Sequence, residues 1–268
     1  MKVESKVIVV TGAGNGIGRE LTLLLLKKGA RVAAVDISEK GLQETAELAG
    51  GLKNKLSTHA VNITDRAAVE ALPGAVLAAH QVVDGLINCA GIIQRFVRFK
   101  DLAINEVERV MNVNFYGTIY MTQAFLPYLM ARPQAHIVNV SSMGGFLPVP
   151  GQTVYGASKA AVKLFTEGLH SEMIGTNVHV TVVFPGAIGT NIAANSGAGL
   201  PISEAREQNK SMKMTEAPVA AQVIIDGMEK NAYRVLVGSD AKMMDFLSRA
   251  MPKRAAKFIY DNMASLLK

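Results

Sequence analysis

Lys6-Val-Ile-Val-Val-Thr11, an apolar run rich in β-branched residues, leads directly into Gly12-Ala-Gly14-Asn-Gly16-Ile-Gly18. The leucine-rich segment 19–28 follows, and Gly29 provides a stop for a helix there. A strand, a glycine turn and a helix in this order are typical of a unit that binds nucleotide phosphates. The glycines let the backbone approach a pyrophosphate, and the start of the helix presents free N–H groups to it.

An acidic residue follows the next predicted strand, 31–36. Asp36 stands twenty residues after Gly16, where its carboxylate can accept hydrogen bonds from both hydroxyls of an adenosine ribose. The glycine spacing is Thr11-Gly12-x-x-x-Gly16-x-Gly18, which differs from the general Gly-x-Gly-x-x-Gly fingerprint. A glycine-rich turn is often a simple tight loop, but its place between strand and helix, with an acid downstream, favours a cofactor site.

The rest of the chain alternates between strand-like and helix-like segments. Further strands are predicted at 55–61, 82–88, 136–141, 178–184 and 234–238. Helices are predicted at 42–48, 65–79, 104–130, 155–173 and 218–230. This alternation predicts an α/β fold: a single-domain, doubly wound parallel sheet over residues 1–268 with helices on both faces.

Two segments stand outside that pattern. Residues 191–215 have weak periodicity, as expected of a substrate lid or binding loop. Residues 241–268 form an amphipathic helical extension. Such helices usually dock on their own domain or on a partner subunit, and contact with a membrane surface is the less favoured alternative.

Composition narrows the function classes. The net charge is +6, but the 28 basic residues are dispersed, so no nucleic-acid partner is expected. The single Cys89 excludes an intramolecular disulfide and a cysteine-rich zinc site, and the five histidines form no metal-ligand pattern, so no metal is expected. We find no apolar run long enough for a transmembrane segment and no ordinary signal peptide. A cytoplasmic location is the default expectation.

A tyrosine and a lysine supply the clearest candidate chemistry. Tyr155 and Lys159 are four residues apart, on one face of a predicted helix. An ammonium beside a phenol favours the phenolate, so the pair can exchange protons with an alcohol or a carbonyl. Ser142, at the end of a predicted strand, can hold the substrate oxygen. A Tyr-x-x-x-Lys pair also arises by chance, so this motif alone proves nothing.

The order and spacing of six motifs resemble those of the short-chain dehydrogenase/reductase family along nearly the whole chain. These motifs are residues 11–18, Asn88-Cys-Ala-Gly91, Asn114, Ser142, Tyr155-Gly-Ala-Ser-Lys159 and Pro185-Gly186. The resemblance implies a Rossmann-type sheet of about seven strands, a nicotinamide cofactor and the catalytic set Asn114, Ser142, Tyr155 and Lys159.

The resemblance also implies individual roles. Tyr155 would exchange the substrate proton, with its pKa lowered by Lys159, which would also bond the nicotinamide ribose. Ser142 would donate to the developing oxyanion, and Asn114 would hold a water molecule that passes protons from Lys159 to solvent. The expected cofactor contacts are Gly12, Asn15, Gly16, Ile17, Gly18, Asp36, Ile37, Asn62, Ile63, Asn88, Ala90, Gly91, Tyr155, Lys159, Pro185, Gly186, Ile188 and Thr190.

The cofactor is predicted to be NAD(H). The 2′-phosphate of NADP would meet the carboxylate of Asp36, and accepting it normally requires a nearby cation, whereas Asn15 and Ile37 stand at the relevant positions. Many relatives carry Asp where this chain has Asn62, which leaves the adenine contact without a charge. Cys89 is expected to be a buried filler rather than a nucleophile, because no base can be assigned to it.

The predicted substrate is a hydrophobic secondary alcohol or its ketone, contacted by Ser142, Met143 and Tyr155. The apolar residues expected around it are Phe146, Leu147, Val149, Phe184, Met212 and Met214. By resemblance, the chain would form a homodimer or homotetramer through the helices around Asn114 and Tyr155.

Three alternative functions are less consistent with the sequence. An NADP(H)-dependent ketoacyl-type reductase conflicts with Asp36, and a non-catalytic dinucleotide-sensing protein could lose Tyr155 or Lys159, yet both are present. A serine hydrolase needs a Gly-x-Ser-x-Gly elbow, and Gly156-Ala-Ser158-Lys-Ala lacks the second glycine.

Overall fold

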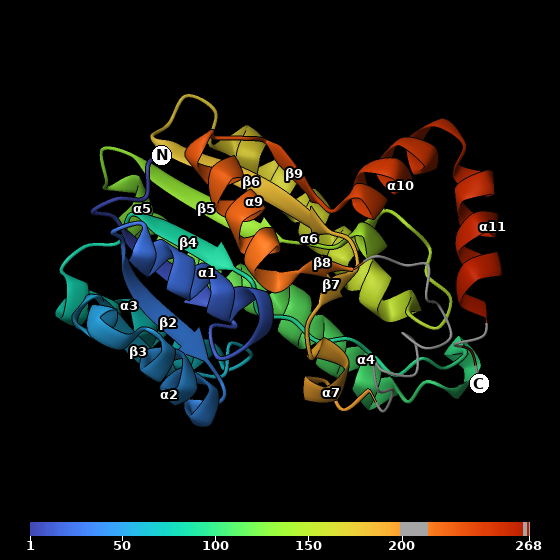
Figure 1. The fold of residues 1–268 in the computed structure, drawn as a ribbon, viewed down its shortest axis with the longest axis horizontal. Coiled ribbons are helices and arrows are strands. Elements are labelled where there is room, and N and C mark those ends of the chain that lie inside the picture. Colours follow the sequence, from blue (N-terminus) through green and yellow to red (C-terminus); the bar gives the residue numbers. More distant parts are fainter. Residues whose placement is uncertain (199–213, 265–266, 268) are drawn as a thin grey trace.

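A seven-stranded parallel sheet forms the centre of the computed structural model, which describes residues 1–198, 214–264 and 267 (Figure 1). The strand order is β3-β2-β1-β4-β5-β6-β9, and every neighbouring pair is parallel. The strands are β1 (Val7–Thr11), β2 (Arg31–Asp36), β3 (Leu56–Ala60), β4 (Gly85–Asn88), β5 (Ala135–Val140), β6 (Val178–Pro185) and β9 (Arg234–Val237). The predicted fold class is confirmed.

Helices cover both faces of this sheet. One face packs against α1 (Gly16–Lys27), α2 (Glu39–Leu48) and α9 (Ala217–Glu229), and the other against α3 (Arg66–His80), α5 (Gly117–Met130) and α6 (Thr153–Glu172). Strand β1 shows why its sequence is uniformly apolar: Ile8 and Val10 enter the first core and Val9 enters the second. A strand buried on both faces needs apolar side chains at every position.

The order of the strands creates a switch point at the carboxyl end of the sheet. The chain moves from β1 to β2 and β3 on one side, and then returns to place β4 on the other side of β1. In open α/β sheets, ligands bind in the crevice outside the strand ends at such a point.

The segment 104–130 departs from the predicted single helix. It comprises α4 (Ile104–Met111), a π-helical turn (Asn112–Tyr116) and α5. Single π-helical turns within α-helices occur frequently at functional sites, and this one contains the fully buried Asn114. A five-residue π-helical turn is too short to show a period of its own, so the sequence pattern predicted one continuous helix. Short 3₁₀ turns lie at Gly50–Lys55, Phe99–Asp101 and Met143–Gly145.

Short elements border the predicted loop 191–215. Strands β7 (Ile188–Gly189) and β8 (Thr215–Glu216) pair in parallel, and α7 (Ile192–Asn195) follows β7. Residues 199–213, including Met212, lie outside the described residues.

The C-terminal segment forms α10 (Ser239–Ala250) and α11 (Pro252–Met263), at the right of Figure 1. Met244, Ala255 and Ile259 of these helices pack with Leu147 in a separate apolar cluster. Among the described residues, we find no helix with the length and apolar character needed to cross a membrane.

The packing predicts that Gly18→Ala destabilises the fold. A Cβ at Gly18 would lie 2.1 Å from the carbonyl oxygen of Gly12, a backbone atom that cannot rotate away. We expect a loss of about 1–3 kcal/mol in the free energy of unfolding, measured by urea denaturation. Gly74→Ala is the matched control, because a Cβ there meets nothing within 4 Å and the substitution favours helix α3. Equal stability of the two variants would contradict this packing.

Candidate active site

A cleft of about 740 Å³ opens at the carboxyl ends of the central strands. Its wall includes most of the residues predicted from the sequence: Gly12, Asn15, Gly16, Ile17, Gly18, Asp36, Ile37, Asn62, Ile63, Ala90, Gly91, Ser142, Tyr155, Lys159, Pro185, Gly186, Ile188 and Thr190. Residues as far apart along the chain as Gly12 and Thr190 therefore meet in one place.

Three predicted site residues lie behind this wall. The Asn88 side chain donates to Thr122 and Asn139 inside the core. Asn114 is fully buried, and Met143 packs beside the cluster formed by Leu147 and the C-terminal helices. These three residues support or border the site rather than forming the cleft surface.

The glycine turn approaches the end of β4 without an intervening side chain. A Cβ at Gly12 would lie 2.9 Å from the Cα of Ala90. The Thr11 hydroxyl accepts hydrogen bonds from the backbone N–H groups of Cys89 and Ala90, at 3.0 and 3.1 Å. At the start of α1, Asn15 makes no side-chain capping hydrogen bond, so the first N–H groups of this helix remain available for an anion.

Asp36 is held in place at the far end of the cleft. Its carboxylate accepts hydrogen bonds from the backbone N–H of Gly14 at 2.8 Å and of Ser38 at 2.9 Å. The nearest arginine in sequence to the glycine turn, Arg19, is engaged elsewhere: it donates to the Gly14 carbonyl and pairs with Glu44 at 2.7 Å. Asp36 thus presents a fixed negative charge to the cleft.

Tyr155 and Ser142 meet over Gly144. A Cβ at Gly144 would lie 3.4 Å from both the Ser142 Oγ and the Tyr155 ring, so the missing side chain leaves room for the pair. The Ser142 Oγ accepts a hydrogen bond from the Gly144 N–H at 3.0 Å, which leaves its own hydrogen free to donate. Burial raises the pKa of the Tyr155 phenol, and its hydrogen bond with Ser142 opposes part of that rise.

The side chains of Lys159 and Asn114 both lie close to Gly91, where the absence of a side chain leaves room for them. A Cβ there would lie 3.1 Å from the Lys159 Nζ and 3.3 Å from the Asn114 Oδ1. The Lys159 ammonium donates to the Val140 carbonyl at 2.9 Å. Burial lowers the pKa of Lys159 to about 8. The predicted net lowering of the Tyr155 pKa is not found: burial raises this pKa, and the influence that opposes the rise is the hydrogen bond with Ser142.

The side-chain amide of Asn114 makes three hydrogen bonds. Its Oδ1 accepts from the Ile92 N–H at 2.8 Å, and its Nδ2 donates to the Ile92 carbonyl and to the Ser158 Oγ, both at 2.9 Å. The side chain therefore ties the loop after β4 to helix α6.

The surroundings of Tyr155 are apolar. Tyr155 packs, as do Phe96 and Ile192, against the buried cluster of Ile93, Ala193 and Ala198, which joins the loop after β4 to α7 and the residues after it. The expected substrate-lining residues Met143, Phe146, Leu147 and Val149 instead pack with α10 and α11. An apolar residue in a sequence does not reveal whether its partner is a ligand or another helix of the chain.

Sequence reasoning missed one wall of the cleft. Asn105, Glu108, Arg109 and Asn112 line it from α4 and the start of the π-helical turn. Their pattern is that of an ordinary solvated helix face, so the sequence carried no sign of this role.

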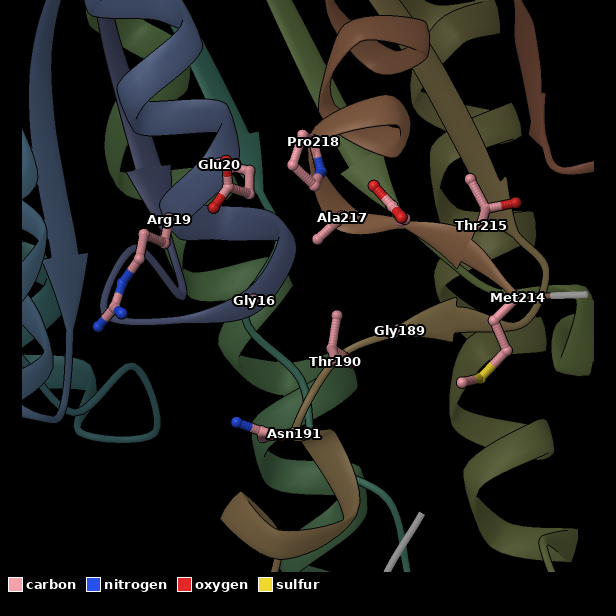
Figure 2. Close-up of a pocket in the computed structure, with 11 residues that line it drawn as sticks. Gly16, Arg19, Glu20, Gly189, Thr190, Asn191, Met214, Thr215, Ala217 and Pro218 are labelled. Atoms are coloured by element: carbon pink, nitrogen blue, oxygen red, sulfur yellow. The ribbon is translucent and has the colours of Figure 1, made fainter. Parts of the chain in front are cut away.

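A second pocket of about 500 Å³ lies beside the glycine turn. Figure 2 shows that Gly16, Arg19 and Glu20 line one side, while β7, β8 and the start of α9 supply the other. The Arg19 side chain points away from Met214 and Thr215. Gly16 and Thr190 line both pockets, so the second pocket adjoins the first.

The short chain dehydrogenase family model matches residues 6–200, which include the glycine turn, Asp36, Ser142, Tyr155 and Lys159. The chain belongs to the short-chain dehydrogenase/reductase family. It is therefore an oxidoreductase of that family, which uses a nicotinamide dinucleotide.

Individual members of this family match most of the chain. A Mycobacterium tuberculosis protein named "Putative oxidoreductase SadH" is 38% identical over 257 residues, covering 92% of this chain and 91% of that protein. A short-chain dehydrogenase/reductase from Burkholderia phymatum, solved with NAD, has a TM-score of 0.84 at 25% identity and covers 93% and 94% of the two chains. A short chain dehydrogenase from Burkholderia cenocepacia, solved with NADP, has a TM-score of 0.80 at 26% identity and covers 97% and 99%.

The cleft fits the cofactor of this family. The cradle at Gly12, which a Cβ would fill, suits a pyrophosphate against the backbone, and the start of α1 offers free N–H groups to it. Asp36 lies where it can accept the ribose hydroxyls.

The pKa of Cys89 leads to a labelling prediction. Cys89 is partly exposed on the cleft wall, and desolvation there raises the pKa of its thiol to about 12, so almost none of it is thiolate at pH 8. We expect iodoacetamide to leave the folded protein unmodified over a time that fully labels it in urea, as read from the intact mass. The single cysteine makes the result unambiguous. Equal labelling rates in the two conditions would show that Cys89 is a reactive thiol.

Proposed function

We propose that this protein is an NAD(H)-dependent oxidoreductase that interconverts a hydrophobic secondary alcohol and its ketone. The observation that carries the proposal is that Tyr155, Ser142 and Lys159 share one cleft with the glycine turn and Asp36. A proton-transfer group and a dinucleotide cradle thus face the same space.

The nicotinamide, when bound, supplies the hydride acceptor or donor. In our proposal the Tyr155 phenolate takes the alcohol proton during oxidation, and the phenol returns it during reduction. The Ser142 hydroxyl, already oriented by the Gly144 N–H, donates to the substrate oxygen. The Lys159 ammonium adds positive charge beside this site, and its Nζ, next to Gly91, would hold the ribose of the cofactor.

The preference for NAD(H) rests on Asp36. Two backbone N–H groups fix its carboxylate on the cleft wall, where it would repel a 2′-phosphate. The adjacent Ile37 is 70% exposed and offers no charge to offset that repulsion. The hydrophobic substrate is supported by the apolar residues around Tyr155.

The proposal extends to the organisation of the protein. We infer one domain over residues 1–268, with 191–215 acting as a substrate lid and 241–268 as an extension. A homodimer or homotetramer is supported by Tyr116, Tyr128 and Leu164, large side chains exposed on the helical layer. A reducing, cytoplasmic location is supported by the lone cysteine.

Substitution of Tyr155 tests the chemistry. Tyr155→Phe removes the proton-transfer oxygen, so we expect kcat to fall on the order of 100-fold or more in absorbance assays at 340 nm, with little change in the NAD Kd.

The pH dependence of the parent enzyme follows from the same role. Oxidation needs the phenolate, so its rate should rise as the pH approaches the raised Tyr155 pKa, while the rate of reduction should fall. An active Tyr155→Phe variant would refute the proposal, and NAD binding without turnover of any alcohol class would favour a dinucleotide sensor.

Cofactor preference has its own test. Asp36→Ala combined with Ile37→Arg replaces an anion with a cation beside the ribose, so the ratio of NADP to NAD affinity should rise about 10- to 100-fold, as expected for a charged hydrogen bond. Fluorescence titration of both cofactors measures this ratio without turnover. Glu39→Ala, an exposed acid on α2, is the control and should leave the ratio unchanged. Equal affinity of the parent for both cofactors would contradict the role of Asp36.

A further inference from the structure

Helix α6, which carries Tyr155, begins without a cap from its own neighbouring residue. Gln152 occupies the capping position but makes no side-chain hydrogen bond to the helix. The first turn of a helix has backbone N–H groups without partners inside the helix, and these need an acceptor from elsewhere when they are buried.

A glutamine from a distant loop supplies that acceptor. The Gln94 Oε1 accepts from the backbone N–H of Val154 at 2.8 Å and from that of Tyr155 at 2.9 Å. Gln94 follows β4 and is fully buried. One amide oxygen thus satisfies two N–H groups, including that of the proposed proton-transfer residue itself.

Further hydrogen bonds fix the orientation of this amide. Its Nε2 donates to the Gly151 carbonyl at 3.0 Å, which settles which end of the amide faces the helix. In return, the Gln152 Nε2 donates to the Gln94 backbone carbonyl at 2.8 Å. The reciprocal hydrogen bonds of Gln94 and Gln152 therefore attach the loop after β4 to the start of α6.

The same loop is held a second time, one turn further along α6. Asn114 binds both backbone groups of Ile92 and donates to Ser158, whose hydroxyl in turn donates to the Tyr155 carbonyl at 2.7 Å. Because the loop begins at Ala90 and Gly91 on the cleft wall, its two attachments set the distance between that wall and Tyr155.

We propose that Gln94 is a positioning residue, which caps the first turn of α6 and thereby holds Tyr155 against Ser142 and the loop after β4. The inference rests on the proposed function, in that Tyr155 must transfer the proton for its position to affect the rate. Gln94 itself does not line the cleft, so it acts through Tyr155 rather than on the substrate.

Gln94→Leu is the primary test, because leucine keeps much of the volume and removes the acceptor. We expect kcat to fall on the order of 10- to 100-fold, as for a misplaced catalytic group, with the NAD Kd within about twofold of the parent. The pH profile provides a readout that general destabilisation would not move. Ser142 opposes the rise of the Tyr155 pKa, so loosening their contact should move the acid limb of kcat/KM for oxidation to higher pH.

Two further variants complete the design. Gln222→Leu is the matched control: Gln222 is a partly buried glutamine on α9 that bonds to Asp226, and its loss should leave both kcat and the pH profile unchanged. Gln94→Glu covers the case in which leucine prevents folding. It keeps an acceptor for both N–H groups and loses the amide donor to Gly151, so kcat should stay within about fivefold of the parent.

Each outcome decides the proposal. A Gln94→Leu enzyme with the kcat and pH profile of the parent overturns the proposal, and so does a Gln94→Leu enzyme that loses only NAD affinity. A Gln94→Glu enzyme whose kcat falls 10- to 100-fold, the loss expected for leucine, also overturns it. Tyr155→Phe, measured in parallel, separates the two levels. If that variant is inactive and Gln94→Leu is not, the positioning role fails while the proposed function stands.

Discussion

Two backbones meet without a side chain between them at the carboxyl ends of β1 and β4, and the cleft depends on that contact. Gly12 leaves room for Ala90, and the Thr11 hydroxyl holds the N–H groups of Cys89 and Ala90. Any Cβ at Gly12 would push the β4 loop outward, and the left-handed conformation there (φ +72°) already favours glycine. The absence of a side chain at Gly12 therefore leaves an open cleft at the switch point, where a larger residue would fill the space.

Burial acts on the two central titratable groups in opposite directions. It raises the pKa of Tyr155 and lowers that of Lys159 to about 8, so each group is pushed toward its neutral form. The sequence suggested simple charge assistance, in which the ammonium produces a phenolate. In the structure the Ser142 hydroxyl counteracts the rise at Tyr155, while the lysine is tied to the Val140 carbonyl. The proton transfer that we propose for Tyr155 therefore depends on close positioning as well as on charge.

The fold could be predicted from the sequence because its strands and helix ends are marked by patterns within short segments of the chain. Strands buried on both faces appear as apolar runs, as at 7–11, and helix ends carry glycines such as Gly29. Most cleft residues could be predicted because they belong to short motifs at strand ends or, for Tyr155 and Lys159, on helix α6, whereas the wall from α4 carries no motif. Gln94 could not, because a single glutamine in a loop has no periodicity and its partners lie about 60 residues away. The two-residue strands β7 and β8 are too short for a pattern, and the burial of Leu147 under α10 and α11 depends on tertiary packing.

Asn88 shows how the core serves the cleft from behind. Its amide donates to Asn139 on β5 and to Thr122 on α5, and Asn139 donates to Thr166 on α6. Apolar contacts alone let a helix slide over a sheet at little cost, whereas buried hydrogen bonds lose their full value when a partner moves. This network therefore fixes α5 and α6 in register with β4 and β5. Helix α6 carries Tyr155, α5 follows the turn that holds Asn114, and strands β4 and β5 lead to Gly91 and Ser142. Asn88, a motif residue expected to touch the cofactor, therefore acts on the position of the proposed catalytic groups from inside the core.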